Sequence, residues 1–274
     1  MTKHQAIQAV SPLPVVRNMR MVDIGGRQLA LKCMGEGTPT VVLETGLGAE
    51  SNEWDAVQRD IAQITRVCCY DRAGRGTSDT AAAPRTALDM VADLRALLRF
   101  AGMTGPYVLV GHSFGGLLMR LFAHRFAGEV SGVVLVDAMH EDQFDIFGPL
   151  FPPAALSEPA ELQRTRAFWQ GGWRSPATTT ERIDFPSSIR EARDIQSLGN
   201  MPLHIIIAGT FLNQPLLPQA YRAKLQERWQ ALQMQFLRLS TRARHSLVLS
   251  SGHFVQRDDP TIVSDAIRTI VAAV

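Results

Sequence analysis

Short apolar runs alternate with stretches of helical periodicity over most of this chain. Runs that suit buried strands lie at 40–44, 66–71, 106–112, 132–137, 205–208 and 246–250. Apolar residues at helical spacing predict helices over 53–64, 86–102, 115–127 and 260–273. Residues 20–33 predict a hairpin that turns at Gly25 and Gly26. This alternation is typical of an α/β protein in which helices cover both faces of a mostly parallel sheet.

One region interrupts the alternation. Residues 140–200 contain no clear strand pattern, and they are rich in proline and in aromatic side chains. The aromatic residues are Phe144, Phe147, Phe151, Phe168, Trp169 and Trp173. We therefore expect residues 140–200 to form an inserted cap, or lid, between two strands. The core domain is then expected to comprise residues 1–139 and 201–274.

The composition narrows the possible partners. The chain has 274 residues, of which 46% are apolar and 20% charged, and its net charge is +2. This balance argues against nucleic acid or an anionic membrane as a partner, and no apolar stretch is long enough to predict a membrane span. The first twenty residues lack the apolar block of a signal peptide. A small molecule is the expected partner, and a homo-oligomer is compatible with the sequence.

The three cysteines predict neither a metal site nor a disulfide framework. Cys33, Cys68 and Cys69 are odd in number, and their spacing is not that of metal ligands. We expect them to be reduced cysteines in buried strands. Reduced cysteines in turn predict a cytoplasmic location.

A candidate nucleophile follows the strand predicted at 106–112. Residues 111–115 read G-H-S-F-G, which places Ser113 between a buried strand and a helical pattern. Small neighbours allow a serine on such a strained turn to expose its hydroxyl at the carboxyl end of the strand. The helix that begins there also directs backbone N–H groups towards a developing oxyanion. The context therefore favours a nucleophile over an incidental serine.

Four segments, in this order, resemble motifs of the α/β-hydrolase family. VVLETGLG (41–48) resembles the segment that carries the oxyanion loop, although the family usually has His-Gly where this chain has Thr45 and Gly46. YDRAGRGTSD (70–79) resembles the family's glycine-containing turn, GHSFGG (111–116) its nucleophile elbow, and SGHFVQRDDP (251–260) its histidine segment. The resemblance, which extends from about residue 20 to the end, implies an eight-stranded sheet, the triad order serine, acid, histidine, and usually no cofactor or metal.

His253 is the expected base. It follows the strand at 246–250 and so lies at the same edge of the sheet as Ser113. Other histidines are expected at strand starts (His204 and His245), in a helix (His124), in the terminal segment (His4), or beside the serine but pointing elsewhere (His112). His140 remains a rival because it also follows a strand end.

The expected acid is Asp137. The resemblance implies an acid after the strand at 205–208, but no aspartate or glutamate occurs between Asp194 and Glu227. The family's other location is the end of the strand after the elbow helix, where Asp137 stands. A carboxylate there would accept the Nδ1 proton of the base. Glu141, Asp142 and a dyad without an acid remain as alternatives.

Two backbone N–H groups are expected to stabilise the oxyanion. One belongs to Phe114, the residue after the nucleophile. By the resemblance, the other belongs to Leu47. We expect structural roles for Glu44, Asp71 and Arg72, with Glu44 pairing with Arg72 or Arg75.

The sequence as a whole predicts a serine hydrolase of the carboxylesterase kind. The aromatic side chains of the cap suggest a small, hydrophobic ester or lactone as substrate, cleaved through an acyl-enzyme. A thioester or an amide would use the same groups. The alternatives are a cofactor-free haloperoxidase or lyase of the same fold, and a ligand-binding receptor on a hydrolase scaffold.

Overall fold

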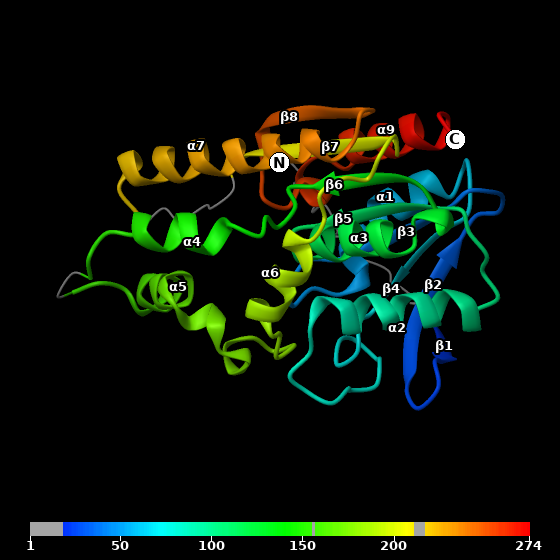
Figure 1. Ribbon diagram of the computed structural model, residues 1–274, viewed down its shortest axis with the longest axis horizontal. Helices are drawn as coiled ribbons and strands as arrows, with labels where there is room; N and C mark the ends of the chain where they lie inside the picture. Colours follow the sequence, from blue (N-terminus) through cyan, green and yellow to red (C-terminus); the bar gives the residue numbers. More distant parts are fainter. Residues whose placement is uncertain (1–18, 155–156, 211–216) are drawn as a thin grey trace, which may run out of the picture.

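A single eight-stranded sheet organises the molecule in the computed structural model, which describes residues 19–154, 157–210 and 217–274 (Figure 1). The strand order is β1-β2-β4-β3-β5-β6-β7-β8. Strand β2 runs antiparallel to both of its neighbours, and the remaining pairs are parallel. The strands are β1 (Arg20–Asp23), β2 (Gln28–Met34), β3 (Thr40–Glu44), β4 (Val67–Tyr70), β5 (Tyr107–His112), β6 (Val130–Val136), β7 (Leu203–Thr210) and β8 (Ala243–Gly252).

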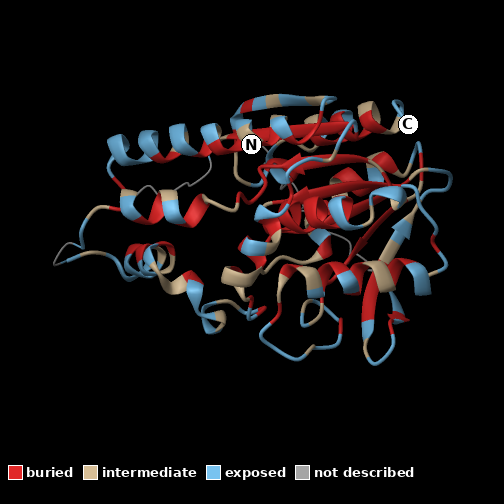
Figure 2. Ribbon diagram, in the orientation of Figure 1, coloured by how far each residue is buried: buried red, intermediate tan, exposed pale blue. Residues whose placement is uncertain are grey.

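The central strands are buried along their whole length because helices cover both faces of the sheet (Figure 2). Helices α1 (Asp55–Ile61), α8 (Val255–Asp258) and α9 (Pro260–Val271) pack on one face. Helices α2 (Ala87–Phe100) and α3 (Phe114–Arg125) pack on the other. This arrangement confirms the predicted fold class.

The segment between β6 and β7 is mainly helical; its first two α-helices lie at the left of Figure 1, and its third lies nearer the middle, beside the core. It contains α4 (Gln143–Phe147), α5 (Ala160–Gln170) and α6 (Phe185–Arg193), and α6 packs against α2 and α3. We call residues 140–200 the insertion. Its aromatic side chains pack on one another: the rings of Phe144 and Trp173, for example, stack at 4.6 Å. The exact division of the chain into core and cap domains stays a prediction.

The sequence did not predict α7 (Gln219–Gln235), which packs against α4 and β7. The predicted helix at 53–64 is shorter in the structure, where a 3₁₀ turn precedes α1. The 3₁₀ turns are η1 (Ser51–Trp54), η2 (Ala127–Glu129), η3 (Gly148–Leu150), η4 (Gly172–Arg174), η5 (Pro176–Thr178) and η6 (Phe236–Leu239).

The expectation of three reduced cysteines is wrong. Cys33 on β2 and Cys68 on β4 form a disulfide, and Cys69 alone is free. The two bonded cysteines face each other across an antiparallel pair of strands, a register that their distant sequence positions do not reveal. Burial raises the pKa of the Cys69 thiol to about 12. The cytoplasmic prediction rested on reduced cysteines and therefore loses that support.

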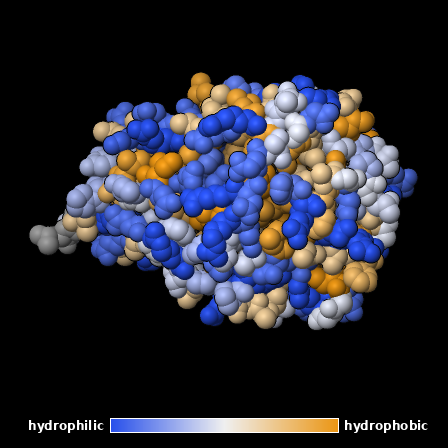
Figure 3. All heavy atoms as spheres, viewed as in Figure 1, coloured by the Kyte–Doolittle hydropathy of each residue, from blue (hydrophilic) through white to orange (hydrophobic). Residues whose placement is uncertain are grey.

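Hydrophilic side chains predominate on the face shown in Figure 3, with hydrophobic groups scattered between them. Within the described residues, no helix combines the length and the apolar character that crossing a membrane requires.

Candidate active site

Ser113 occupies the sharp turn between β5 and α3, as predicted. Its backbone has φ 51° and ψ −119°, a strained conformation for a residue that is not glycine. The turn is fixed from both sides, because the Ser113 N–H donates to the Val136 carbonyl and the Ser113 carbonyl accepts from Met139 N. The start of α3 lies so close to β3 that a Cβ on Gly115 would come within 2.6 Å of the Glu44 carbonyl oxygen. Glycine is therefore required there.

The structure brings Ser113, His253 and Asp137 together from three separate loops. The Nε2 atom of His253 lies 3.0 Å from Ser113 Oγ. The Nδ1 atom of the same ring lies 2.6 Å from Asp137 Oδ2. Because an ionised carboxylate can only accept, the ring proton belongs on Nδ1, and Nε2 is left as the acceptor for the serine hydroxyl.

Asp137 is fully buried at the end of β6, and neighbouring donors hold its carboxylate. Its Oδ1 accepts from Ala208 N at 2.9 Å and from Trp229 Nε1 at 2.7 Å. Oδ2 is thereby turned towards His253. The sequence did not reveal Trp229 as a partner, because it lies on α7, a helix that the sequence had not predicted.

The two rival acids have other partners. Glu141 Oε2 accepts from Arg120 at 2.8 Å, and Asp142 Oδ1 accepts from Arg193 at 2.8 Å. Burial alone would raise the pKa of Glu141, but the Arg120 guanidinium holds this pKa below its ordinary value. Both carboxylates are therefore engaged outside the contact between His253 and Ser113.

His112 supports the histidine loop, a contact that the sequence did not suggest. Its Nε2 lies 2.9 Å from the His253 carbonyl oxygen, so Nε2 must carry the donated proton. Burial, followed by the nearby His253, lowers the pKa of His112 well below 6.5 and keeps its ring neutral. His140, the rival base, instead stacks on Phe236 at 5.0 Å and accepts from Asp142 N.

The two candidate oxyanion donors flank the nucleophile. Phe114 is the first residue of α3, where backbone N–H groups have no partner within the helix. Leu47 belongs to the loop after β3, which we call the oxyanion loop (residues 45–48). A Cβ on Gly46 would lie 2.9 Å from His112 Nδ1 and 3.4 Å from Ser113 Cβ, so this loop packs directly on the elbow.

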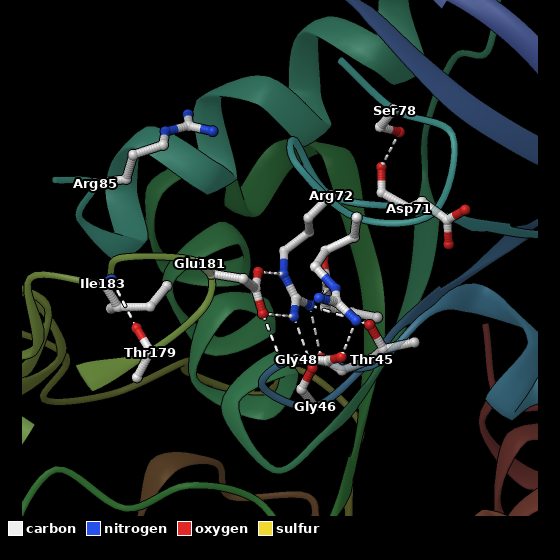
Figure 4. A network of polar contacts seen from close by, with 12 residues as sticks. Thr45, Gly46, Gly48, Asp71, Arg72, Ser78, Arg85, Thr179, Glu181 and Ile183 are labelled. Atoms are coloured by element: carbon white, nitrogen blue, oxygen red, sulfur yellow. Dashed lines mark hydrogen bonds and ion pairs between the residues drawn. The ribbon is translucent and has the colours of Figure 1, made fainter. Parts of the chain in front are cut away.

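Arg72 contacts the oxyanion loop and lies at the centre of a polar network (Figure 4). It pairs with Glu44, as the sequence suggested, at 2.6 Å. It also pairs with Glu181 of the insertion at 2.6 Å, a partner that lies far away in the sequence and was not predicted.

A small apolar cavity of about 190 Å³ opens beside Ser113. Its walls combine residues of the core with aromatic residues of the insertion, and Gln143 is the polar side chain that the insertion contributes. The lining residues are Leu47, Ser113, Phe114, Met139, Gln143, Phe144, Phe168, Trp169, Phe185 and His253. Across the part of the chain that the structure describes, no group of three or more His, Cys, Asp or Glu side chains could hold a metal ion.

Known proteins resemble this chain in sequence and in fold. Residues 39–180, slightly more than half of the chain, match the family model of the alpha/beta hydrolase fold. The uncharacterized protein YqjL of Bacillus subtilis is 29% identical over 240 residues, which cover 87% of this chain and 86% of that protein.

Two solved structures illustrate the shared fold. A thermophilic esterase from Thermogutta terrifontis has a TM-score of 0.62 at 18% identity, over 93% of this chain and 98% of the esterase. A bromoperoxidase from Bacillus anthracis has a TM-score of 0.60 at 16% identity, over 93% and 99% of the two chains. Structural likeness at such low identity establishes the fold and not the reaction. Together with the family match over residues 39–180, it shows that this chain belongs to the alpha/beta hydrolase fold family.

Proposed function

We propose that this protein is a serine hydrolase that cleaves a small, hydrophobic carboxylic ester or lactone through a covalent acyl-enzyme. One observation carries the proposal: the His253 ring bridges Ser113 Oγ and the buried Asp137 carboxylate. A nucleophile, a base and a group that orients the base are the three roles that this chemistry uses.

The proposed reaction has two stages. Ser113 Oγ attacks the substrate carbonyl carbon while its proton passes to His253 Nε2, and Asp137 stabilises the resulting imidazolium. The oxyanion accepts hydrogen bonds from the N–H groups of Leu47 and Phe114. The imidazolium then gives its proton to the leaving alkoxide as the ester C–O bond breaks. In the second stage a water molecule gives a proton to His253 and attacks the acyl carbonyl carbon, and His253 returns this proton to Ser113 Oγ as the acyl–serine bond breaks and the acid leaves.

The cavity beside Ser113 limits the size of the proposed acyl group. Its volume is about 190 Å³, and an apolar cavity of about 150 Å³ is large enough to hold benzene. A short aliphatic or single-ring acyl group therefore fits inside this cavity, whereas a long fatty acyl chain would have to extend beyond it. The aromatic walls favour an apolar group.

A nitrophenyl ester assay tests the proposal. We expect the wild-type protein to hydrolyse the acetate, butyrate and benzoate esters, and kcat/KM to fall steeply for the palmitate ester. Ser113→Ala should reduce kcat by a factor on the order of 10⁶, the cost of losing a serine nucleophile.

A matched serine provides the control. Ser131 is half-buried at the start of β6, where its hydroxyl donates to the Tyr107 carbonyl at the opposite end of the strands. Ser131→Ala should retain the wild-type rate. Equal rates for wild type and Ser113→Ala would defeat the hydrolase proposal and favour a receptor on this scaffold. Turnover that requires peroxide and halide would favour a haloperoxidase.

A further inference from the structure

The guanidinium of Arg72 holds the backbone of the oxyanion loop directly. Its Nη1 donates to the Thr45 carbonyl at 2.8 Å, and its Nη2 donates to the Gly46 carbonyl at 2.6 Å. The guanidinium also lies 5.7 Å from the ring centroid of Phe114, the residue that carries the other candidate donor. Arg72 therefore holds the backbone of the oxyanion loop and also lies near the side chain of Phe114.

The contact at Gly46 fixes the direction of the Leu47 N–H. The Gly46 carbonyl and the Leu47 N–H belong to one peptide unit, which is planar and has the two groups on opposite sides. When Arg72 holds the carbonyl, the plane cannot rotate, and the Leu47 N–H must point away from Arg72. A donor fixed in advance stabilises an oxyanion without reorganising during the reaction.

Glu181 of the insertion holds Arg72 in place. Its two carboxylate oxygens accept from Arg72 Nε at 2.6 Å and from Nη2 at 2.8 Å, a bidentate pair that fixes the plane of the guanidinium. Glu181 Oε1 also accepts from Gly48 N at 2.6 Å, at the far end of the oxyanion loop. One side chain of the insertion thus holds the loop both through Arg72 and directly (Figure 4).

The segment that carries Glu181 is itself fixed to the core. Ile183 forms a β-bridge with Arg85, and the Arg85 backbone exchanges hydrogen bonds with Arg182 and Asp184. Ser188 Oγ, further along the insertion, accepts from Ala87 N at the start of α2. Glu181 is therefore presented to Arg72 from a rigid support.

The three charged side chains are almost completely removed from water. Those of Glu44, Arg72 and Glu181 each expose 2% or less. Burial raises the pKa of Glu44 above its ordinary value. Burial alone would also raise the pKa of Glu181, but the ion pair with Arg72 holds this pKa below its ordinary value. Glu181 is thus the carboxylate that is better able to stay ionised beside the guanidinium.

We propose that Arg72 and Glu181 are positioning residues, which aim the Leu47 N–H at the oxyanion and make the geometry of the oxyanion hole depend on the docked insertion. The proposal rests on the proposed function, since it assigns these residues to the same reaction. Neither side chain needs to touch the substrate, so the effect of changing them should appear in the transition state more than in substrate binding.

The test uses Glu181→Ala, Glu181→Gln and Arg72→Lys. For Glu181→Ala we expect kcat to fall about 100-fold with little change in KM, the loss typical of a misplaced or missing oxyanion donor. Glu181→Gln keeps an acceptor for Gly48 N and should lose less. Arg72→Lys keeps the charge but not the planar fork, and should not match wild type. Inhibition by an aryl trifluoromethyl ketone, which adds to the serine as an oxyanion, should weaken in parallel with kcat.

A second ion pair of the insertion supplies the control. Glu158 forms a bidentate pair with the buried Arg166, so Glu158→Gln disturbs a comparable pair outside the oxyanion loop. This variant should keep the wild-type kcat and the wild-type affinity for the ketone. If Glu181→Ala behaves as this control does, the positioning role is overturned while the hydrolase proposal stands.

A measurement independent of activity separates the two proposals. Amide hydrogen exchange at residues 45–48 should be faster in Glu181→Ala and Glu181→Gln than in wild type and Glu158→Gln. Unchanged exchange at these amides in both Glu181 variants would overturn the positioning role, even if wild type hydrolysed no ester. A wild type without hydrolase activity but with the expected change in exchange would defeat only the proposed function.

Discussion

The two halves of the candidate site are held in different ways. On the acid–base side, a backbone N–H of β7 and the Trp229 indole donate hydrogen bonds to Asp137. The backbone carbonyl of His253 accepts a hydrogen bond from the neutral ring of His112. On the oxyanion side, a buried arginine paired with two glutamates holds the loop, and one of these glutamates comes from the insertion. The first half thus depends mainly on neutral donors, and the second on buried ion pairs.

This difference predicts how substitutions in each half of the site should affect activity. A neutral donor that is lost leaves one hydrogen bond unmade, whereas a buried charge that loses its partner is left without compensation. We therefore expect the loss of activity caused by substitutions around Asp137 to depend on which hydrogen bond is removed. Changes around Arg72 should instead disturb the loop as a unit.

The largest effect around the acid is expected for Asp137→Asn. An amide can no longer stabilise the imidazolium and favours the wrong ring tautomer, so kcat should fall by a factor on the order of 10⁴. Steady-state kinetics on a nitrophenyl ester, with circular dichroism to check folding, measure this loss.

The neighbouring carboxylates are the controls for this substitution. Glu141→Gln and Asp142→Asn remove acids that pair with Arg120 and Arg193, so both should keep kcat within a few-fold of wild type. If Asp137→Asn keeps full activity while either of these loses it, the acid has been assigned to the wrong residue.

The Glu181 variants should rank second, with a loss of about 100-fold for Glu181→Ala and a smaller loss for Glu181→Gln. These variants test the oxyanion half of the site by itself, because they leave every contact of Asp137 and His253 in place. If their losses equalled that of Asp137→Asn, the two halves would not be separable in the way that we describe.

A smaller effect is expected for Trp229→Phe, which removes one of the donors to Asp137 Oδ1. The carboxylate keeps the Ala208 N–H and its contact with His253, so kcat should fall about tenfold, the value of one hydrogen bond to a charged group. Trp54→Phe is the matched control, since Trp54 is equally buried and its Nε1 has no hydrogen-bond partner within the described residues. Similar kcat values for the two variants would contradict a role for the Trp229 indole.

The fold and the positions of Ser113, Asp137 and His253 could be predicted because their signals are local. One short segment, residues 111–115, indicates the turn at Ser113. Buried apolar runs predict the strands at whose ends Asp137 and His253 lie. Parallel strands place their carboxyl ends at one edge, so residues that are distant in sequence meet without any further information. Glu44 was expected to pair with Arg72 or Arg75, and in the structure its ion pair is with Arg72.

What could not be predicted depends on contacts that no local pattern encodes. Glu181 reaches Arg72 from an insertion whose path is set by aromatic packing and by a β-bridge to Arg85. Trp229 lies on a helix without a clear apolar periodicity in the sequence. The disulfide between Cys33 and Cys68 depends on strand register, which the sequence does not specify.

The central claim is that His253 activates the Ser113 hydroxyl. A fluorophosphonate probe followed by peptide mass spectrometry tests it most directly, because the probe reacts with activated serines whatever the natural substrate is. We predict one label per chain on the peptide that contains Ser113, and labelling that is strongly slowed in His253→Ala. An absent label, a label on another serine, or equal labelling rates in both proteins would contradict the account.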